Sequence, residues 1–196
     1  MVDSNVLELQ QKKQRLLLHC CCAPCASYVL EVLTPVYECT VFFYNPNIEP
    51  EDEFKKRKSE LDKLIIRNSL LTGIDVLDCG YCNDVFAKAV SVLREEPEGR
   101  DRCRVCFELR LKETAVRAAE GSYDMFATTL SVSPHKDALL LNEIGSRLAV
   151  EHGVGYLVSD FKKREGYKQS IELSALYNLY RQSYCGCLSD KEATFD

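Results

Sequence analysis

Short apolar runs alternate with longer amphipathic segments along the whole of this 196-residue chain, and this alternation constrains its fold more than any other feature. The pattern predicts strands over residues 16–18, 41–44, 74–77, 123–128 and 156–159. It predicts helices over residues 24–33, 51–71, 84–93, 103–119, 135–151 and 166–180. Such alternation favours an α/β fold with a mostly parallel sheet and helices on both of its faces. No repeat or linker interrupts it, so we expect residues 1–196 to form a single domain.

Three groups of cysteines lie near the predicted ends of these elements. Cys20, Cys21, Cys22 and Cys25 follow the first strand. Cys103 and Cys106 open a helix, and Cys185 and Cys187 follow the last helix. Ligands of open parallel sheets bind beyond the carboxyl ends of the strands. The sequence therefore predicts a cysteine-lined site at that edge of the sheet.

The cellular compartment decides how these cysteines are interpreted. The start of the chain is polar, and no apolar run approaches the roughly 18 residues that a membrane span needs. We therefore expect a cytoplasmic protein whose eleven cysteines stay reduced. An odd number of cysteines also cannot pair completely, so disulfide bonds are not expected. Clustered, reduced thiolates are typical metal ligands.

The number of thiols indicates more than one simple metal ion. A C-x-x-C motif such as Cys103–Cys106 is shared by zinc sites, redox pairs and iron–sulfur clusters. One tetrahedral metal takes four ligands, and the three groups offer about twice that number. The adjacent Cys21 and Cys22 point in different directions, which suits separate irons of a four-iron cube better than one small ion. We therefore expect Cys21 and Cys22, with Cys103 and Cys106, to hold a [4Fe–4S] cluster.

The remaining cysteines divide into further candidates and core residues. Cys25, Cys185 and Cys187 are left for a second metal or an exposed thiol pair, and Gly186 permits a close bend between the last two. Cys39 is interpreted as a small core residue, and Cys20 as a residue buried beside the strand. Cys79 and Cys82 form another C-x-x-C motif with no evident third partner.

Several polar residues lie close to these groups. His19 and Tyr184 could each supply a proton, although a structural histidine and a packing tyrosine are the alternatives. Asn45, Asn47 and Ser133 are expected on loops after strands, where they would contact a ligand or cap the loop.

Local basic stretches matter because the net charge of −5 does not attract nucleic acid. Residues 55–58 follow three acids and are interpreted as a solvated helix face. Residues 162–168 have fewer neighbouring acids. The second stretch, with Lys162 and Lys163, is therefore the better candidate for contacting a polyanion.

Six ordered motifs carry a resemblance to a known family. They cover residues 19–25 (HCCCAPC), 43–48 (FYNPNI), 102–107 (RCRVCF), 128–136 (TTLSVSPHK), 160–163 (DFKK) and 180–187 (YRQSYCGC). Together they closely resemble the QueH family of epoxyqueuosine reductases over residues 16–188.

The resemblance implies a fold, an activity and partners. The fold would be Rossmann-like, similar to the HUP and PP-loop group. The activity would be reduction of the epoxide of epoxyqueuosine to queuosine at the wobble position of tRNA, without cobalamin. It also implies a [4Fe–4S] cluster, a second metal ion such as iron or zinc, and an electron donor. Lys136 and Arg181 lie within the motifs and are expected contacts to substrate or RNA, whereas Cys20, Cys79 and Cys82 depart from the family pattern.

Three other function classes fit the sequence less well. A PP-loop ATP pyrophosphatase needs a glycine-containing phosphate loop after the first strand, and residues 19–25 contain no glycine. A structural zinc module that binds RNA would be colourless, whereas a [4Fe–4S] protein is brown. A thiol–disulfide oxidoreductase would show a thioredoxin-like order of elements, which this chain lacks.

Overall fold

Five parallel strands form the centre of the molecule in the computed structural model, which describes residues 12–187. The sheet has the order β3-β2-β1-β4-β5, and each of its four strand pairings is parallel. The chain builds one side of β1 and then crosses to the other, so the switch point lies between β1 and β4. This arrangement confirms the Rossmann-like fold expected from the sequence. The strands are β1 (Arg15–His19), β2 (Glu38–Phe43), β3 (Val76–Asp78), β4 (Met125–Thr128) and β5 (Gly155–Tyr156).

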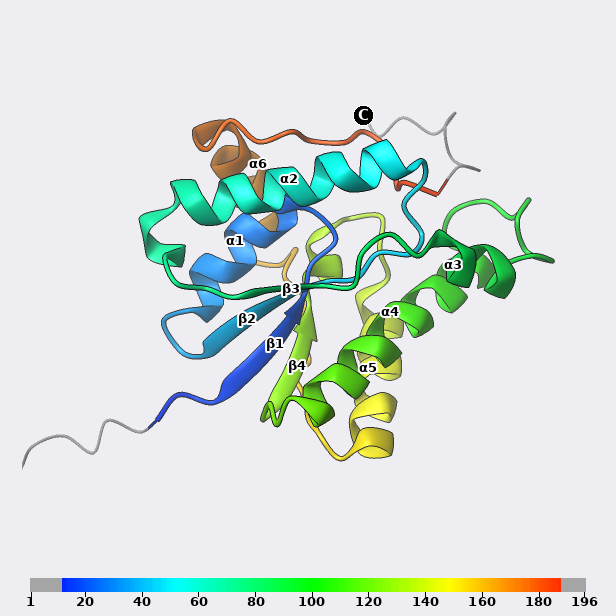
Figure 1. Ribbon diagram of the computed structural model, residues 1–196, viewed down its shortest axis with the longest axis horizontal. Helices are drawn as coiled ribbons and strands as arrows, with labels where there is room; N and C mark the ends of the chain where they lie inside the picture. The colour runs from blue at the N-terminus through cyan, green and yellow to red at the C-terminus, as the bar shows by residue number, and fades with distance from the viewer. Residues whose placement is uncertain (1–11, 188–196) are drawn as a thin grey trace, which may run out of the picture.

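Helices cover both faces of the sheet because its central strands are apolar on both sides. Leu16 and Leu18 pack toward one core cluster, and Leu17, which alternates with them, packs into the other. Figure 1 shows one face covered by α1, α2 and α6, and the opposite face covered by α4 and α5. The long helices are α1 (Ala23–Leu33), α2 (Glu51–Arg67), α4 (Asp101–Glu120), α5 (Ala138–His152) and α6 (Gly166–Leu176). Shorter elements are α3 (Asn83–Ala89) and the 3₁₀ turns η1 (Ser69–Leu71) and η2 (Thr129–Val132).

Capping residues set helix ends that periodicity placed only approximately. The helix predicted over 51–71 ends at Arg67, because Asn68 leaves the helical conformation and its side chain accepts a hydrogen bond from Leu70 N. The helix predicted from 135 begins at Ala138, because Asp137 Oδ1 accepts hydrogen bonds from Leu139 N and Leu140 N at 2.8 and 3.2 Å. The last strand is shorter than predicted and covers only Gly155–Tyr156. Within residues 12–187, no helix combines the length and apolarity that would let it cross a bilayer.

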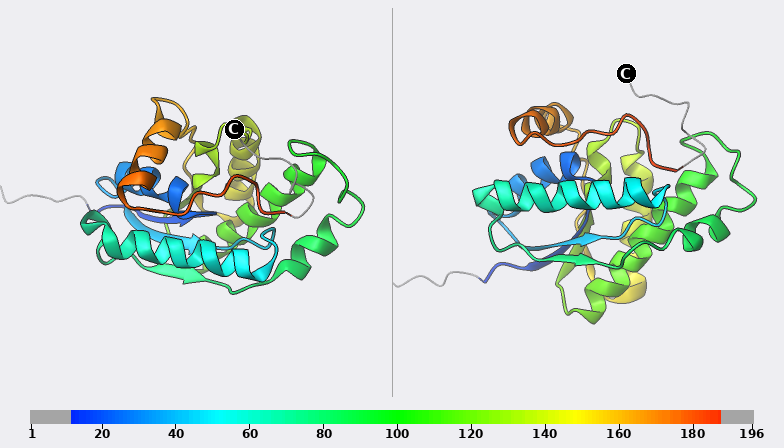
Figure 2. Two further views of the ribbon diagram at one scale, coloured as in Figure 1. Left: turned by 90° about the horizontal axis from the view of Figure 1, so that it is seen from above. Right: turned by 45° about the horizontal axis from the view of Figure 1, so that its top comes forward.

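The segment that follows α6 returns across the molecule beside α2 and reaches α3 and α4 (Figure 2). Tyr180 N donates a hydrogen bond to Glu60 Oε2 of α2 at 2.9 Å. Farther along, Cys187 packs against Phe86 and Val90 at the end of α3. This path brings the last two cysteines of the described chain to the edge of the sheet where the other cysteine groups lie.

Candidate metal centre

The first thiol group lies between β1 and α1. The Sγ atoms of Cys21, Cys22 and Cys25 all lie within 4.8 Å of one another, and those of Cys21 and Cys22 are 3.7 Å apart. Cys25 joins its neighbours because α1 begins at Ala23, with Pro24 in its first turn, and that turn carries the Cys25 side chain back over the strand end. The sequence left Cys25 with Cys185 and Cys187 as candidates for a second metal, and in the structure the sulfur of Cys25 lies beside those of Cys21 and Cys22. Hydrogen bonds from the thiols of Cys21 and Cys25 hold the pKa of Cys22 well below its usual range, which favours the thiolate form of Cys22.

The second thiol group lies in the first two turns of α4. Cys103 and Cys106 are both buried, and Cys103 Sγ accepts a hydrogen bond from Gly99 N at 3.1 Å. Burial raises the pKa of both thiols, that of Cys106 to about 11. The charge of Cys185 raises them further, which places the third thiol group beside the second.

The third group is the turn Cys185–Gly186–Cys187. Gly186 has a φ of 107°, a conformation that few residues other than glycine adopt. A hydrogen bond from the Cys187 thiol, followed by the nearby cations, lowers the pKa of Cys185 well below its usual range. The nearest cation is Lys136, whose Nζ lies 3.3 Å from Cys185 Sγ and also pairs with Glu98.

One buried guanidinium faces thiols from all three groups. Burial lowers the pKa of Arg110, and the charges of Cys106, Cys21, Cys185 and Cys103 outweigh that effect and raise it. Its Nε donates to the carbonyl oxygen of Cys106 at 3.2 Å, whereas its Nη2 has no hydrogen-bond partner among residues 12–187. The three separate segments that carry the thiol groups therefore converge on Arg110. Arg110 was missed from the sequence, because an arginine inside an amphipathic helix carries no signal of burial.

A cavity of about 290 Å³ opens above the first thiol group and is also lined by Cys185. Asn47 Oδ1 and Gln182 Oε1 are buried and have no hydrogen-bond partner among the described residues. Asn45 is fixed by its Nδ2, which donates to the carbonyl oxygen of Cys20 at 2.8 Å. The other polar lining residues predicted from the sequence are Ser133, Lys136, Arg181 and Tyr184.

His19 lies in the sheet and is not among the lining residues of this cavity. It is fully buried; its Nδ1 is 2.9 Å from Thr128 Oγ1 and its Nε2 is 3.1 Å from the carbonyl oxygen of Tyr44. Burial lowers its pKa to about 3, so the ring is neutral at physiological pH. These contacts favour the structural alternative over proton donation.

Tyr184, in contrast, faces the cavity. Burial raises its pKa to about 12, and the Glu53 carboxylate contributes in the same direction. The guanidinium carbon of Arg57 lies 5.3 Å from the centre of its ring. The phenol therefore keeps its proton at neutral pH at the cavity wall.

The first basic stretch differs from its interpretation as a solvated face. Lys55 and Lys56 are exposed, and Lys55 Nζ is 2.9 Å from Glu51 Oε1. The prediction is wrong for Arg57, whose side chain is 3% exposed and pairs with Glu53. The reason is tertiary: the segment after α6 covers this side of α2, which the sequence of the helix alone does not reveal.

The lysines of the second basic stretch pair with more acidic residues than the sequence predicted. Lys162 Nζ and Lys163 Nζ lie 3.2 and 3.8 Å from carboxylate oxygens of Asp160, and Lys168 pairs with Glu165. Lys162 Nζ also donates to the carbonyl oxygen of Lys136 at 3.1 Å, which places the stretch next to a residue of the cavity wall.

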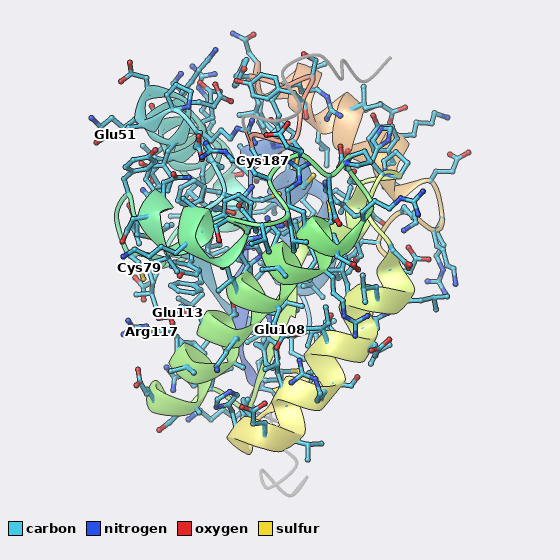
Figure 3. The ribbon with its side chains drawn as sticks, turned by 90° about the vertical axis from the view of Figure 1, so that its right-hand side faces the viewer. Glu51, Cys79, Glu108, Glu113, Arg117 and Cys187 are labelled. Carbon is cyan, nitrogen blue, oxygen red and sulfur yellow. The ribbon has the colours of Figure 1, made fainter. Side chains whose placement is uncertain are left out.

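The other cysteines lie in different surroundings. Cys20 adjoins the first thiol group and feels the charges of Cys21 and Cys22, and Cys82 is half-buried against the core cluster that contains Cys103. Cys20 and Cys39 are buried in the core that α1 and α2 cover, as the sequence suggested. Cys79 is exposed and feels the charges of Arg117 and Glu113 on α4. Figure 3 shows Cys79 beside those two residues and well away from Cys187.

The family model and the relatives in sequence indicate one family. The family model described as "Epoxyqueuosine reductase QueH" matches residues 16–192. Relatives with that name include a protein of Streptococcus pyogenes, 41% identical over 94% of this chain and 73% of its own. Another, from Thermotoga maritima, is 34% identical over 88% of each chain. Among solved structures, a predicted subunit of a tRNA methyltransferase from Methanocaldococcus jannaschii aligns with a TM-score of 0.53 at 14% identity, over 82% of this chain and 76% of that one. At that identity, the likeness concerns the fold alone.

Proposed function

This chain belongs to the epoxyqueuosine reductase QueH family, and on that premise we propose that it reduces epoxyqueuosine to queuosine at the wobble position of tRNA. The observation that carries the proposal is the convergence of thiols from three segments around Arg110, beside one cavity. The site lies beyond the carboxyl end of β1, next to the switch point of the sheet, where folds of this class bind their ligands.

The donor set fits a thiolate-bound iron–sulfur centre. The thiols are buried or half-buried, and those of Cys21, Cys22 and Cys25 lie within 4.8 Å of one another. The buried cation of Arg110 would offset the negative charge of thiolates from all three groups. Cys21, Cys22, Cys103 and Cys106 would hold a [4Fe–4S] cluster. Cys25, Cys185 and Cys187 would hold a second metal ion, iron or zinc, or serve as redox thiols. Such a centre supplies single electrons when it is bound, and a second metal supplies a Lewis acid.

The reaction needs two electrons and two protons, because the epoxide oxygen leaves as water when the alkene forms. Tyr184 holds a proton at the cavity wall and is the residue we assign to protonate the departing oxygen. His19 is less suited to this role, because both of its ring nitrogens already have partners. Asn47 Oδ1 and Gln182 Oε1 would accept hydrogen bonds from the bound nucleoside, since a buried acceptor without a partner is costly.

The tRNA substrate would approach over the mouth of the cavity. The modified base must leave the anticodon stack to enter it. Asn45 and Ser133 line the cavity and would contact the base. Lys136 and Arg181 also line it and would face the backbone phosphates of the tRNA. Lys162 and Lys163 lie beside this wall and would extend the basic surface. In this proposal the enzyme works in the cytoplasm, without cobalamin, and takes its electrons from a separate donor.

Turnover on the modified tRNA tests the proposal. The protein is reconstituted without oxygen with iron and sulfide, reduced chemically and incubated with tRNA that carries epoxyqueuosine. Mass spectrometry of the digested nucleosides should show the loss of one oxygen atom, and Cys106→Ser should abolish it. A cluster-loaded preparation that yields no queuosine would refute the assignment.

A further inference from the structure

We propose that Arg57 is a positioning residue that holds the turn Cys185–Gly186–Cys187 in place at the cavity. Arg57 belongs to α2, and the turn lies 128 residues later in the chain. The part of this inference that concerns turnover rests on the proposed function. The part that concerns the position of the two thiols does not.

The guanidinium of Arg57 makes contacts in three directions. Its Nε donates to Glu53 Oε1 at 2.7 Å, one turn earlier on the same helix. Its Nη1 donates to the carbonyl oxygen of Cys185 at 3.1 Å, and its Nη2 lies 3.5 Å from that of Tyr184. The group therefore joins α2 to two successive peptide units of the turn.

The turn fits closely against this side chain. A Cβ atom on Gly186 would lie 3.0 Å from Arg57 Nη1, and the φ of 107° already disfavours other residues. The carbonyl oxygen of Gly186 is held from the other side, because it accepts a hydrogen bond from Glu49 N at 2.8 Å. Glycine is needed here both for the backbone conformation and for the approach of the arginine.

These contacts explain why the residue is arginine. A planar guanidinium can bind a carboxylate and two carbonyl oxygens at once, whereas a lysine ammonium is a single point charge. Lysine could keep the ion pair with Glu53 but could not also bind both carbonyl groups. The comparison of the two side chains therefore separates an ion pair that only stabilises α2 from a contact that positions the turn.

The position of the turn matters because it carries two thiols of the candidate centre. Cys185 lines the cavity, and Cys187 lies on the far side of Gly186 against α3. The peptide groups bound by Arg57 precede and include Cys185, so movement of the turn would displace that thiol directly. The charge of Arg57 also lies near Cys22 and Cys21, which places it between the first and third thiol groups.

Differential alkylation of metal-free protein tests the inference without substrate or cofactor. Trypsin releases Cys185 and Cys187 in peptide 182–191, and Cys79 and Cys82 in peptide 68–88, which serves as an internal reference away from the turn. Relative to that reference, Arg57→Met should raise alkylation of peptide 182–191 at least about tenfold, because bonds from a charged donor are lost. Lys55→Met is the matched control: it removes an exposed cation two residues away and should leave the ratio unchanged.

The lysine variant decides between positioning and simple stabilisation. Arg57→Lys should unfold at nearly the wild-type temperature, because the pair with Glu53 is kept, yet it should still expose peptide 182–191. If Arg57→Lys restores the wild-type alkylation ratio in full, the positioning role is refuted. An unchanged ratio in a folded Arg57→Met variant would refute it equally.

A second variant covers the case in which Arg57→Met fails to fold. Gly186→Ala disturbs the same contact from the side of the turn and leaves the ion pair intact. It should also raise alkylation of peptide 182–191, and a wild-type ratio would overturn the inference.

With the reconstituted enzyme, Arg57→Lys should lower kcat several-fold with little change in KM for tRNA. An enzyme without turnover would count against the proposed function and would leave the alkylation result valid.

Discussion

Lys136 Nζ lies 3.3 Å from Cys185 Sγ, although the two residues are 49 positions apart in the chain. The same ammonium group pairs with Glu98 and is almost fully buried. A buried cation beside a sulfur favours the thiolate, which is both the better nucleophile and the form that binds metals. The hydrogen bond from Cys187 acts in the same direction and is the larger effect.

Removing this cation should make Cys185 less reactive. In metal-free protein at pH 7, Lys136→Met should slow alkylation of Cys185 by roughly three- to tenfold, because the pKa of the thiol rises. Lys136→Arg keeps the charge and should retain most of the reactivity. The measurement is the rate of iodoacetamide modification followed by peptide mass spectrometry, and equal rates in all three proteins would contradict the prediction.

Metal content should separate the clustered cysteines from the other C-x-x-C motif. Cys106→Ser should lose most of the bound iron after anaerobic reconstitution, because it removes a buried ligand of the proposed cluster. Cys79→Ser combined with Cys82→Ser should retain it, since Cys79 lies on the surface beside Glu113 and Arg117. Iron analysis compares the two variants, and iron loss in the Cys79→Ser, Cys82→Ser double variant would assign one or both of those thiols to the centre.

His19 should make the folded protein less stable in mild acid. Its pKa is about 3 in the folded state and about 6.5 when unfolded, so between these values the unfolded chain binds more protons. The contribution of His19 to the free energy of unfolding is fully present above pH 6.5. It is lost as the pH falls toward 3, by up to about 1.4 kcal/mol per pH unit. Denaturant unfolding at several pH values between 5 and 7 measures this effect. The free energy of unfolding should change less per pH unit in His19→Gln than in wild type. His152→Gln is the control, and identical slopes for the three proteins would show that His19 is not buried and neutral.

Binding of tRNA should depend on the basic residues next to the cavity. Lys163 is 77% exposed, so its replacement should not disturb the fold. Lys163→Met should weaken binding a few-fold and reduce the slope of log affinity against log salt by about 0.7 to 0.9. Lys88→Met removes an equally exposed cation on α3 and should leave the slope unchanged. Fluorescence titration across salt concentrations is the measurement, and equal slopes for both variants would place the RNA elsewhere.

The order of elements could be predicted because it depends on local periodicity. Leu16 to Leu18 predicted β1, and the alternation of strands and helices predicted a parallel sheet. Element ends were less accurate where a single side chain decides them. Asp137 and Asn68 are examples, since each caps a neighbouring turn.

The site was predictable only where its residues have a distinctive chemistry. Clustered cysteines indicated a metal centre whatever their exact contacts, and the structure brings Cys25 to Cys21 and Cys22. Arg57 and Arg110 could not be identified, because burial of a charged helix residue depends on which distant segment covers it. Arg57 is covered by the turn at Gly186, and that packing has no counterpart in the sequence of α2.

The identity of the bound centre tests the account most directly. Protein purified without oxygen should be brown, contain about four iron and four sulfide ions per chain in the cluster, and give the electron paramagnetic resonance signal of a reduced [4Fe–4S] centre. That signal should be lost when serine replaces any one of Cys21, Cys22, Cys103 and Cys106. A colourless wild-type protein that contains zinc and no iron would contradict the account and favour a structural zinc module.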